Sequence, residues 1–248
     1  MPRANRYYQP GLIWHITHRC HKKEFLLKFI KDKQAWISWM RASKRQFGLR
    51  ILNYTITSNH IHLLVLDDGR EEDRTIPRSI QLVAGRVAQE YNKRKGRWGA
   101  FWEDRYHATA IETGEHLVNC ITYIDLNMVR AKVVSHPNDW EFGGYYELMC
   151  FRERLRDQLV DWHALLPVLG ITSLERLKEA RREWIAKECR SGRLERDPRW
   201  TECIAVGSRE YTERILNTVG GERDPGSVSR RRYGLSPIFC GPKHGLKA

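Results

Sequence analysis

Hydrophobic positions in the first part of the chain follow two different periods. Residues 12–20 alternate between apolar and polar side chains, which predicts a strand, and residues 31–47 carry large apolar side chains at helical spacing. Residues 49–56 and 60–66 again read as strands, joined by the short polar connection 57–59. The chain therefore opens with a strand, a helix and a hairpin.

The same patterns continue to residue 131. After a polar stretch at 67–73, which we interpret as a loop, one apolar stripe predicts an amphipathic helix from Ile76 that ends near Gly96. Residues 101–112 read as a fourth strand and residues 115–131 as another helix. This order predicts an α+β fold, ferredoxin-like or RRM-like, with an antiparallel sheet and helices on one face.

The pattern changes near residue 150. Residues 161–169 and 174–187 are predicted helices, and Thr172 with Glu175 form a potential capping box for the second.

We accordingly divide the chain into three parts. Residues 1–150 form the predicted catalytic domain and residues 151–219 a helical C-terminal extension. Residues 220–248, rich in Gly, Pro, Ser and Arg, are expected to be a flexible basic tail.

Composition favours a folded protein that binds a polyanion. Hydrophobic residues make up 41% and charged residues 29%, which is typical of a folded domain. Lys and Arg number 43 against 30 Asp and Glu, a formal charge of +13, so nucleic acid is the leading partner class. Positive charge concentrates in the first fifty residues, whereas residues 101–150 are rich in carboxylates.

The lengths of the apolar runs and the spacing of the cysteines indicate the cellular compartment. No apolar run reaches the roughly 18–20 residues of a membrane span, and no hydrophobic signal segment follows the basic N-terminus. We therefore expect a cytoplasmic protein without a membrane partner. The six cysteines contain no Cys-x-x-Cys pair, so reduced thiols are expected rather than a zinc ribbon or a disulfide scaffold.

Two histidines in the third predicted strand are candidate metal ligands. His60 and His62 are two residues apart, so their side chains share one face of the strand, with Cα atoms about 6.5–7 Å apart. Both imidazoles can then approach one divalent cation. A pair of half-buried structural histidines is the alternative, and the spacing alone leaves both open.

The helix at 115–131 carries a second candidate pair. Tyr123 and Asn127 lie beside its apolar stripe and, four residues apart, are neighbours on its surface. A phenol next to a carboxamide suggests a nucleophile beside a metal-orienting oxygen, because a tyrosine with a pKa near 10 needs a nearby cation or base to attack. The alternative is that Tyr123 packs beneath a neighbouring helix.

Three segments in this order carry a family resemblance. They are Ser58-Asn59-His60-Ile61-His62-Leu63-Leu64-Val65, Gly99-Ala100-Phe101-Trp102-Glu103-Asp104-Arg105-Tyr106 and Tyr123-Ile124-Asp125-Leu126-Asn127-Met128-Val129-Arg130-Ala131. Over about residues 7–150 the sequence resembles the REP-associated tyrosine transposases, which are single-tyrosine HUH transposases of the IS200-like type.

The resemblance implies a function and roles for four residues. His60 and His62 would bind a divalent metal ion, Mg²⁺ or Mn²⁺, and Asn127 would complete the protein ligands. Tyr123 would attack a phosphate of single-stranded DNA, at a hairpin or palindromic repeat, and form a 5′-phosphotyrosine link. The protein would thus be a DNA endonuclease and strand transferase.

Two positions depart from the family pattern. Ser58 and Met128 stand where the family commonly has proline. Since a proline disturbs a helical hydrogen bond, Met128 predicts a straighter helix around Tyr123.

Candidate DNA contacts flank these motifs. The cations are Arg19, Lys22, Lys23, Arg105 and Arg130, and the aromatic residues that could stack on unpaired bases are Trp102 and Tyr106. Each has the alternative role of an ordinary surface charge or core aromatic residue.

Other functions fit less well. The metallo-β-lactamase motif needs an aspartate where Leu64 stands, and an amidohydrolase barrel needs about eight strand–helix units. A nucleic-acid-binding protein that keeps the fold without cutting is the remaining alternative. Retention of His60, His62, Tyr123 and Asn127 favours the enzyme. A homodimer is compatible with the sequence.

Overall fold

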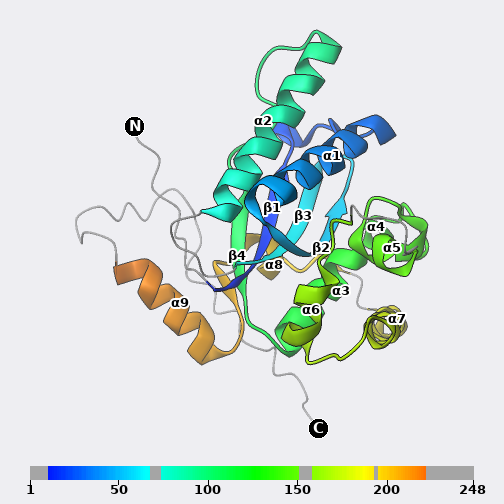
Figure 1. Ribbon diagram of the computed structural model, residues 1–248, viewed down its shortest axis with the longest axis vertical. Coiled ribbons are helices and arrows are strands. Elements are labelled where there is room, and N and C mark those ends of the chain that lie inside the picture. Colours follow the sequence, from blue (N-terminus) through cyan, green and yellow to red (C-terminus); the bar gives the residue numbers. More distant parts are fainter. Residues whose placement is uncertain (1–10, 68–73, 151–157, 193–194, 222–248) are drawn as a thin grey trace.

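The computed structural model describes residues 11–67, 74–150, 158–192 and 195–221 (Figure 1). The predicted loop at 67–73 and the predicted tail at 220–248 lie almost entirely outside these residues.

A five-stranded sheet forms the centre of the fold. Its strands are β1 (Ile13–Arg19), β2 (Arg50–Ile56), β3 (His60–Leu66), β4 (His107–Ile111) and β5 (Ala205–Val206). The order across the sheet is β2-β3-β1-β4-β5, with antiparallel pairing everywhere except between β4 and β5. The first four strands have the ferredoxin-like arrangement, so the predicted α+β class is confirmed.

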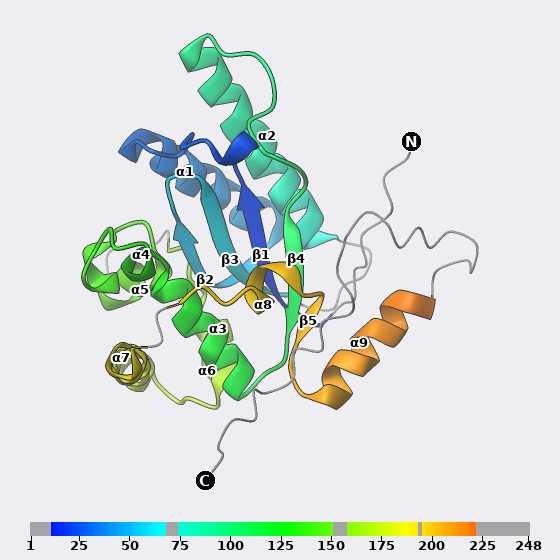
Figure 2. The same ribbon diagram turned by 180° about the vertical axis from the view of Figure 1, so that it is seen from behind.

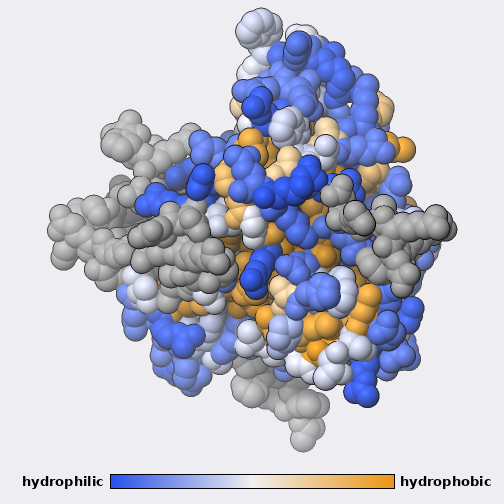
Figure 3. Space-filling model, in the orientation of Figure 1, coloured by the Kyte–Doolittle hydropathy of each residue, from blue (hydrophilic) through white to orange (hydrophobic). Residues whose placement is uncertain are grey.

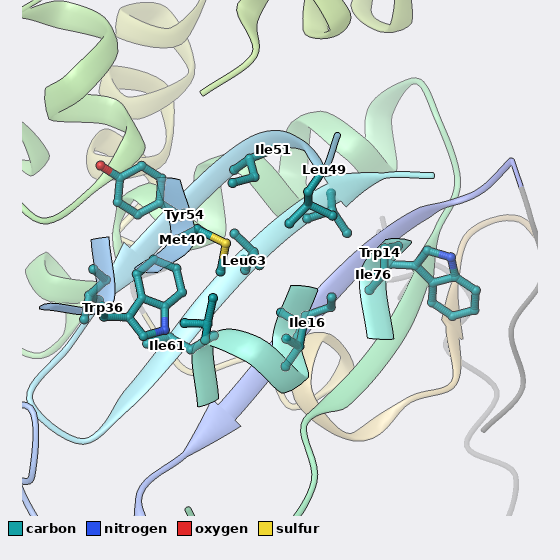
Figure 4. Close-up of a cluster of buried hydrophobic side chains, with 14 of the residues drawn as sticks. Trp14, Ile16, Trp36, Met40, Leu49, Ile51, Tyr54, Ile61, Leu63 and Ile76 are labelled. Atoms are coloured by element: carbon teal, nitrogen blue, oxygen red, sulfur yellow. The ribbon is translucent and has the colours of Figure 1, made fainter. Parts of the chain in front are cut away.

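Two long helices cover one face of the sheet. They are α1 (Ile30–Phe47) and α2 (Thr75–Lys95), and both lie on the same side in Figure 1. Trp14, Ile16 and Ile61 point from the strands into this layer, where they pack with other buried apolar side chains (Figure 4). Burial of this apolar surface is the main stabilising term of the domain.

Helices also cover the opposite face of the sheet. The sequence had predicted helices on one face only. A second cluster joins Ile13, Leu52 and Leu64 of the sheet to α3 (Glu115–Asp125). It extends to two further helices, α6 (Trp162–Leu169) and α7 (Leu174–Ser191). The fold therefore has three layers, because residues beyond 150 supply the outer part of this face.

Residues near the end of the described chain complete the sheet. The backbone N–H of Ala110 donates to the carbonyl of Ile204 at 2.8 Å, and that of Glu112 donates to Val206 at 3.0 Å. Strand β5 lies between α8 (Arg199–Glu202) and α9 (Arg209–Gly221). The three-part domain division stays a prediction, but residues assigned to the extension add a strand to the sheet.

The predicted helix at 115–131 is interrupted. Leu126 has φ −80° and ψ 4°, which separates α3 from the short α4 (Asn127–Arg130). The straighter helix expected from Met128 is therefore wrong.

Two other boundaries differ from the prediction. Strand β4 begins only at His107, because Trp102 instead turns onto α2 and donates its indole N–H to the carbonyl of Ala84 at 3.0 Å. Helix α7 is capped by Ser173, whose hydroxyl accepts from the N–H of Arg176 at 3.2 Å, rather than by Thr172. Ser173 has the extended backbone that an N-cap requires.

Four short elements complete the secondary structure. They are the 3-10 helices η1 (His21–Lys23) and η3 (Pro137–Asp139), helix α5 (Gly144–Met149) and helix α4. No helix within the described ranges is long and apolar enough to cross a membrane.

Burial of Tyr211 predicts a loss of stability in alkali. The side chain is 6% exposed, and burial raises the pKa of Tyr211 from 10.0 to about 12. The unfolded chain then releases this proton at lower pH than the folded chain, so the free energy of unfolding falls as pH rises between those two values. We expect Tyr211→Phe to reduce this fall in urea unfolding curves, while stability at neutral pH is kept because the Tyr211 hydroxyl has no hydrogen-bond partner among the described residues. Equal alkaline slopes for both proteins would contradict the assignment.

Candidate active site

The structure brings the four predicted chemical residues to one cleft. His60 and His62 come from β3, Tyr123 from α3 and Asn127 from α4, and all four line a cleft of about 620 Å³. Its lining includes Tyr123 of α3 and Thr201 of α8, and Figure 2 shows these two helices on the same face of the sheet. The imidazole ring centroids of His60 and His62 are 4.9 Å apart.

Hydrogen bonds fix the state of the His62 ring. Its Nε2 lies 2.9 Å from the side-chain amide nitrogen of Asn127, which can only donate. Nε2 is therefore the acceptor, and Nδ1 carries the ring hydrogen. That N–H donates to Nε2 of the fully buried His15 at 2.9 Å. The Nε2 lone pair of His62 thus points to the side of the ring where Asn127 lies.

The His60 ring is the same tautomer, with hydrogen on Nδ1, but different partners determine it. Its Nδ1 lies 2.7 Å from the side-chain oxygen of Asn59 and 3.0 Å from the hydroxyl of Thr57. An amide oxygen can only accept, so Nδ1 donates and Nε2 keeps its lone pair. Both imidazoles therefore carry hydrogen on Nδ1 and a lone pair on Nε2, the atom that would bind a cation, and in His62 this lone pair accepts from Asn127.

Burial keeps both rings neutral. It lowers the pKa of His60 to about 4, with a smaller contribution from Arg19, and lowers the pKa of His62 well below 6.5. A neutral imidazole is the form that binds metal. Together with the Asn127 carboxamide, the site offers two nitrogen donors and one oxygen donor, a mixture that suits manganese and related divalent ions. The residues present fit the predicted metal.

Among the described residues, no group of three or more His, Cys, Asp or Glu side chains could hold a metal ion, so the candidate site depends on two imidazoles and one carboxamide.

Tyr123 is held tightly beside the histidines. Its side chain is 9% exposed, and its ring lies edge-on to His62 with centroids 5.8 Å apart and at the same distance from Trp200. The guanidinium of Arg130 lies 4.0 Å from the ring centroid and donates to the Tyr123 carbonyl at 2.7 Å. The phenol therefore both packs against its neighbours and lines the cleft.

Burial and nearby charges have opposite effects on the pKa of Tyr123. Burial raises the pKa of Tyr123, while the guanidinium groups of Arg130 and Arg196 oppose that rise. Because burial dominates, the hydroxyl stays protonated at neutral pH. Chemistry at this oxygen needs a further cation or a base.

A buried polar cluster fixes the helix that carries Tyr123. Both carboxylate oxygens of Asp125 accept from the guanidinium of Arg181 at 2.6 Å, and Asn53 donates to the same carboxylate at 2.8 Å. A bulge in β2 at Leu52 turns Asn53 toward α3. Arg181 comes from α7, so the extension reaches the residue between Tyr123 and Asn127.

Several site residues were not predicted. They are His15, Arg181, Arg196 and Trp200. The sequence could have indicated His15 as a site residue, since it is a polar residue inside an apolar strand. The other three lie more than fifty residues from Tyr123 in sequence, and nothing local marks their contact with it.

The five cationic residues predicted to contact DNA lie in two regions of the structure. Arg19, Arg105 and Arg130 line the cleft. Lys22 and Lys23 lie in η1, both with positive φ.

The two predicted stacking residues are partly buried. Trp102 stacks on His18 with ring centroids 4.0 Å apart, and Tyr106 packs against the first core cluster. Their role in stacking on bases stays a prediction.

Comparisons with known proteins gave one family match and matches to solved transposase structures. Residues 9–127 match the family model described as IS200-like transposase. A solved REP-associated tyrosine transposase bound to a REP hairpin is 19% identical, with a TM-score of 0.46, and the match covers 65% of this chain and 94% of that one. A putative transposase from Deinococcus radiodurans R1 is 15% identical, with a TM-score of 0.34 and coverage of 53% and 98%. The curated proteins gave no match.

The first of these matches covers the candidate site. It spans residues 9–127 of the 248 residues of the chain. This segment includes His60, His62 and Tyr123 and ends at Asn127.

The ion pair between Asp125 and Arg181 predicts that removing the arginine alone destabilises the protein more than removing both charges. Arg181→Met leaves a buried carboxylate without its cation and should lower the free energy of unfolding by about 3–5 kcal/mol in urea. The double variant Arg181→Met, Asp125→Asn should recover most of this loss, because the buried charge is gone. Arg182→Met, at the exposed neighbouring position, is the control and should change little. Equal losses in the single and double variants would contradict the pairing.

The bond between His15 and His62 predicts an effect on metal affinity. Removing a group that orients a metal-binding histidine commonly weakens binding 10- to 100-fold, roughly. We expect that loss for Mn²⁺ in His15→Ala by calorimetry, with part of it restored in His15→Gln, whose amide oxygen can accept the same hydrogen. His163→Ala, an exposed histidine outside the cleft, should bind Mn²⁺ as the unmodified protein does. Unchanged affinity in His15→Ala would disprove the role.

Proposed function

We propose that this protein is a metal-dependent single-stranded DNA endonuclease and strand transferase that acts through a 5′-phosphotyrosine intermediate. The observation that carries the proposal is the meeting of Tyr123, Asn127 and two histidines with hydrogen on Nδ1 in one cleft. The match of residues 9–127 to the IS200-like transposase family model supports the same reaction class. The proposed substrate is DNA with a hairpin or palindromic repeat.

His60 and His62 would hold the metal through Nε2, and Asn127 through its side-chain oxygen after the amide turns over. A divalent cation bound there, Mg²⁺ or Mn²⁺, would supply Lewis acidity to a non-bridging phosphate oxygen. The neutral rings of His60 and His62 are ready for this without losing a proton. His15 keeps His62 in the required state.

Tyr123 supplies the nucleophile. Its oxygen bonds to phosphorus and its proton leaves to water, while the bond from phosphorus to the 3′ oxygen breaks and that oxygen takes a proton. The products are a 5′-phosphotyrosine and a free 3′ hydroxyl. Attack by the 3′ hydroxyl of a second strand reverses these changes and rejoins DNA, so no nucleotide cofactor is needed.

Arginines around the cleft would hold the DNA backbone. Arg19, Arg105, Arg130 and Arg196 line it, and a guanidinium pairs well with phosphate oxygens. Arg130 has a second task, since its stacking on the phenol ring keeps Tyr123 in place.

One observation favours a different function on the same fold. Tyr123 is 9% exposed, and burial raises its pKa, as in a structural tyrosine. A protein that binds nucleic acid without cutting it would have such a residue. The two functions differ in whether a covalent link forms.

A denaturant-resistant adduct distinguishes them. We expect end-labelled hairpin DNA with a single-stranded flank to become covalently attached to the protein in Mn²⁺ or Mg²⁺, and to remain attached in denaturing gels. Tyr123→Phe should abolish the adduct, because only the attacking oxygen is lost. Tyr91→Phe, a tyrosine that does not line the cleft, should keep it. DNA binding without an adduct in either metal would favour the non-cleaving protein.

A further inference from the structure

Exposed apolar side chains concentrate at one end of the molecule. Within the described residues seven large hydrophobic side chains are exposed, and four of them lie around the beginning of α1 and the end of α2: Phe25, Phe29, Ile30 and Trp98. Trp98 is 93% exposed and Phe25 66%. Figure 3 shows hydrophobic side chains emerging from a mainly hydrophilic surface beside the beginning of α1. Such a gathering usually marks an interaction site.

Contacts between two segments hold this surface together. Arg97 pairs with Glu24 at 3.6 Å, so this ion pair joins the segment that carries Trp98 to the segment that carries Phe25. The ammonium of Lys95 lies 5.4 Å from the ring centroid of Phe29. Figures 1 and 2 agree that the beginning of α1 and the end of α2 lie at the same end of the fold.

Cations surround these aromatic rings. The exposed lysines of the two segments are Lys22, Lys23, Lys28, Lys31, Lys93 and Lys95. The carboxylates of the same segments, Glu24 and Asp32, are paired with Arg97 and Arg94. The aromatic–cationic surface, meaning Phe25, Phe29, Ile30, Trp98 and these lysines, therefore carries net positive charge.

Asn59 connects one edge of this surface to His60 of the active-site cleft. The side chain of Asn59 donates to the carbonyl of Lys23 at 3.1 Å, and its oxygen accepts from His60. Lys22 and Lys23 adopt the left-handed backbone, with φ 50° and 60°, a strained conformation that tends to occur at functional sites. Lys23 is therefore the part of this surface that is linked through Asn59 to His60.

We infer that the aromatic–cationic surface binds unpaired nucleotides that flank the cleaved phosphate, with bases stacked on Phe25, Phe29 and Trp98 and phosphates held by the lysines. This inference rests on the proposed function and deepens it. Exposed aromatic rings next to lysines are the combination that single-stranded nucleic acid uses. A second copy of this chain is the less favourable occupant, since its own lysines would face these lysines.

Binding measurements on two oligonucleotides test the inference apart from catalysis. All proteins carry Tyr123→Phe, so that no covalent link contributes. One probe is a blunt DNA hairpin, and the other is the same hairpin with a single-stranded extension of mixed sequence. The surface variant is Phe25→Ala, Phe29→Ala, Trp98→Ala, and the control is Val133→Ala, Leu216→Ala, two exposed apolar residues outside this surface.

The expected result is specific to the extension. The surface variant should bind the extended hairpin at least about tenfold more weakly, since stacking contributes roughly 1–3 kcal/mol per base. Its affinity for the blunt hairpin should be unchanged, and the control should match the parent on both. Thermal melting should confirm that both variants are folded.

Two outcomes would overturn the inference. One is equal affinity of the surface variant and its parent for the extended hairpin. The other is a change from dimer to monomer in sedimentation with no change in DNA binding, which would assign the surface to self-association. Failure of the proposed function appears elsewhere, as the absence of an adduct with the unmodified protein, so the two failures are distinguishable.

Discussion

A hydrogen bond between two buried imidazoles organises this site. His15 and His62 are diagonal neighbours on the antiparallel pair β1–β3, in which His15 lies opposite Leu64 and Thr17 opposite His62. The amide of Asn127 donates to Nε2 of His62, so Nδ1 carries the hydrogen, and His15 accepts that hydrogen and holds the ring with Nε2 toward Asn127. A slip of one residue in this pairing would put the two rings on opposite faces of the sheet. The register of two central strands thus determines the chemistry of the cleft.

The second half of the site depends on a different long-range contact. The helix that carries Tyr123 ends at Asp125, and that carboxylate is held by Arg181 of α7 and Asn53 of β2. Trp200 of α8 covers the phenol from the other side. Residues beyond 150 therefore contribute to the shape of the site although they lie outside the segment that matches the transposase family. Their contribution is positional, since they contact the helix and ring rather than supply the proposed metal ligands.

Local sequence patterns predicted much of this arrangement, but not all of it. The strand His60–Leu66 was predicted with its observed bounds, because alternation and a polar turn define both of its ends. The meeting of His60, His62, Tyr123 and Asn127 was also expected, from side-chain faces and from the family resemblance. The break at Leu126 was not, because it coincides with buried contacts from Asn53 and Arg181 that no local pattern encodes. Strand β5 was missed for the same reason, since two residues carry no periodicity.

Anomalous scattering from crystals grown with Mn²⁺ tests the central claim most directly. The account predicts one strong peak within bonding distance of Nε2 of His60, Nε2 of His62 and the side-chain oxygen of Asn127, with the hydroxyl of Tyr123 turned toward it. A peak bound elsewhere, or none at these residues while Tyr123 points into the core, would contradict it.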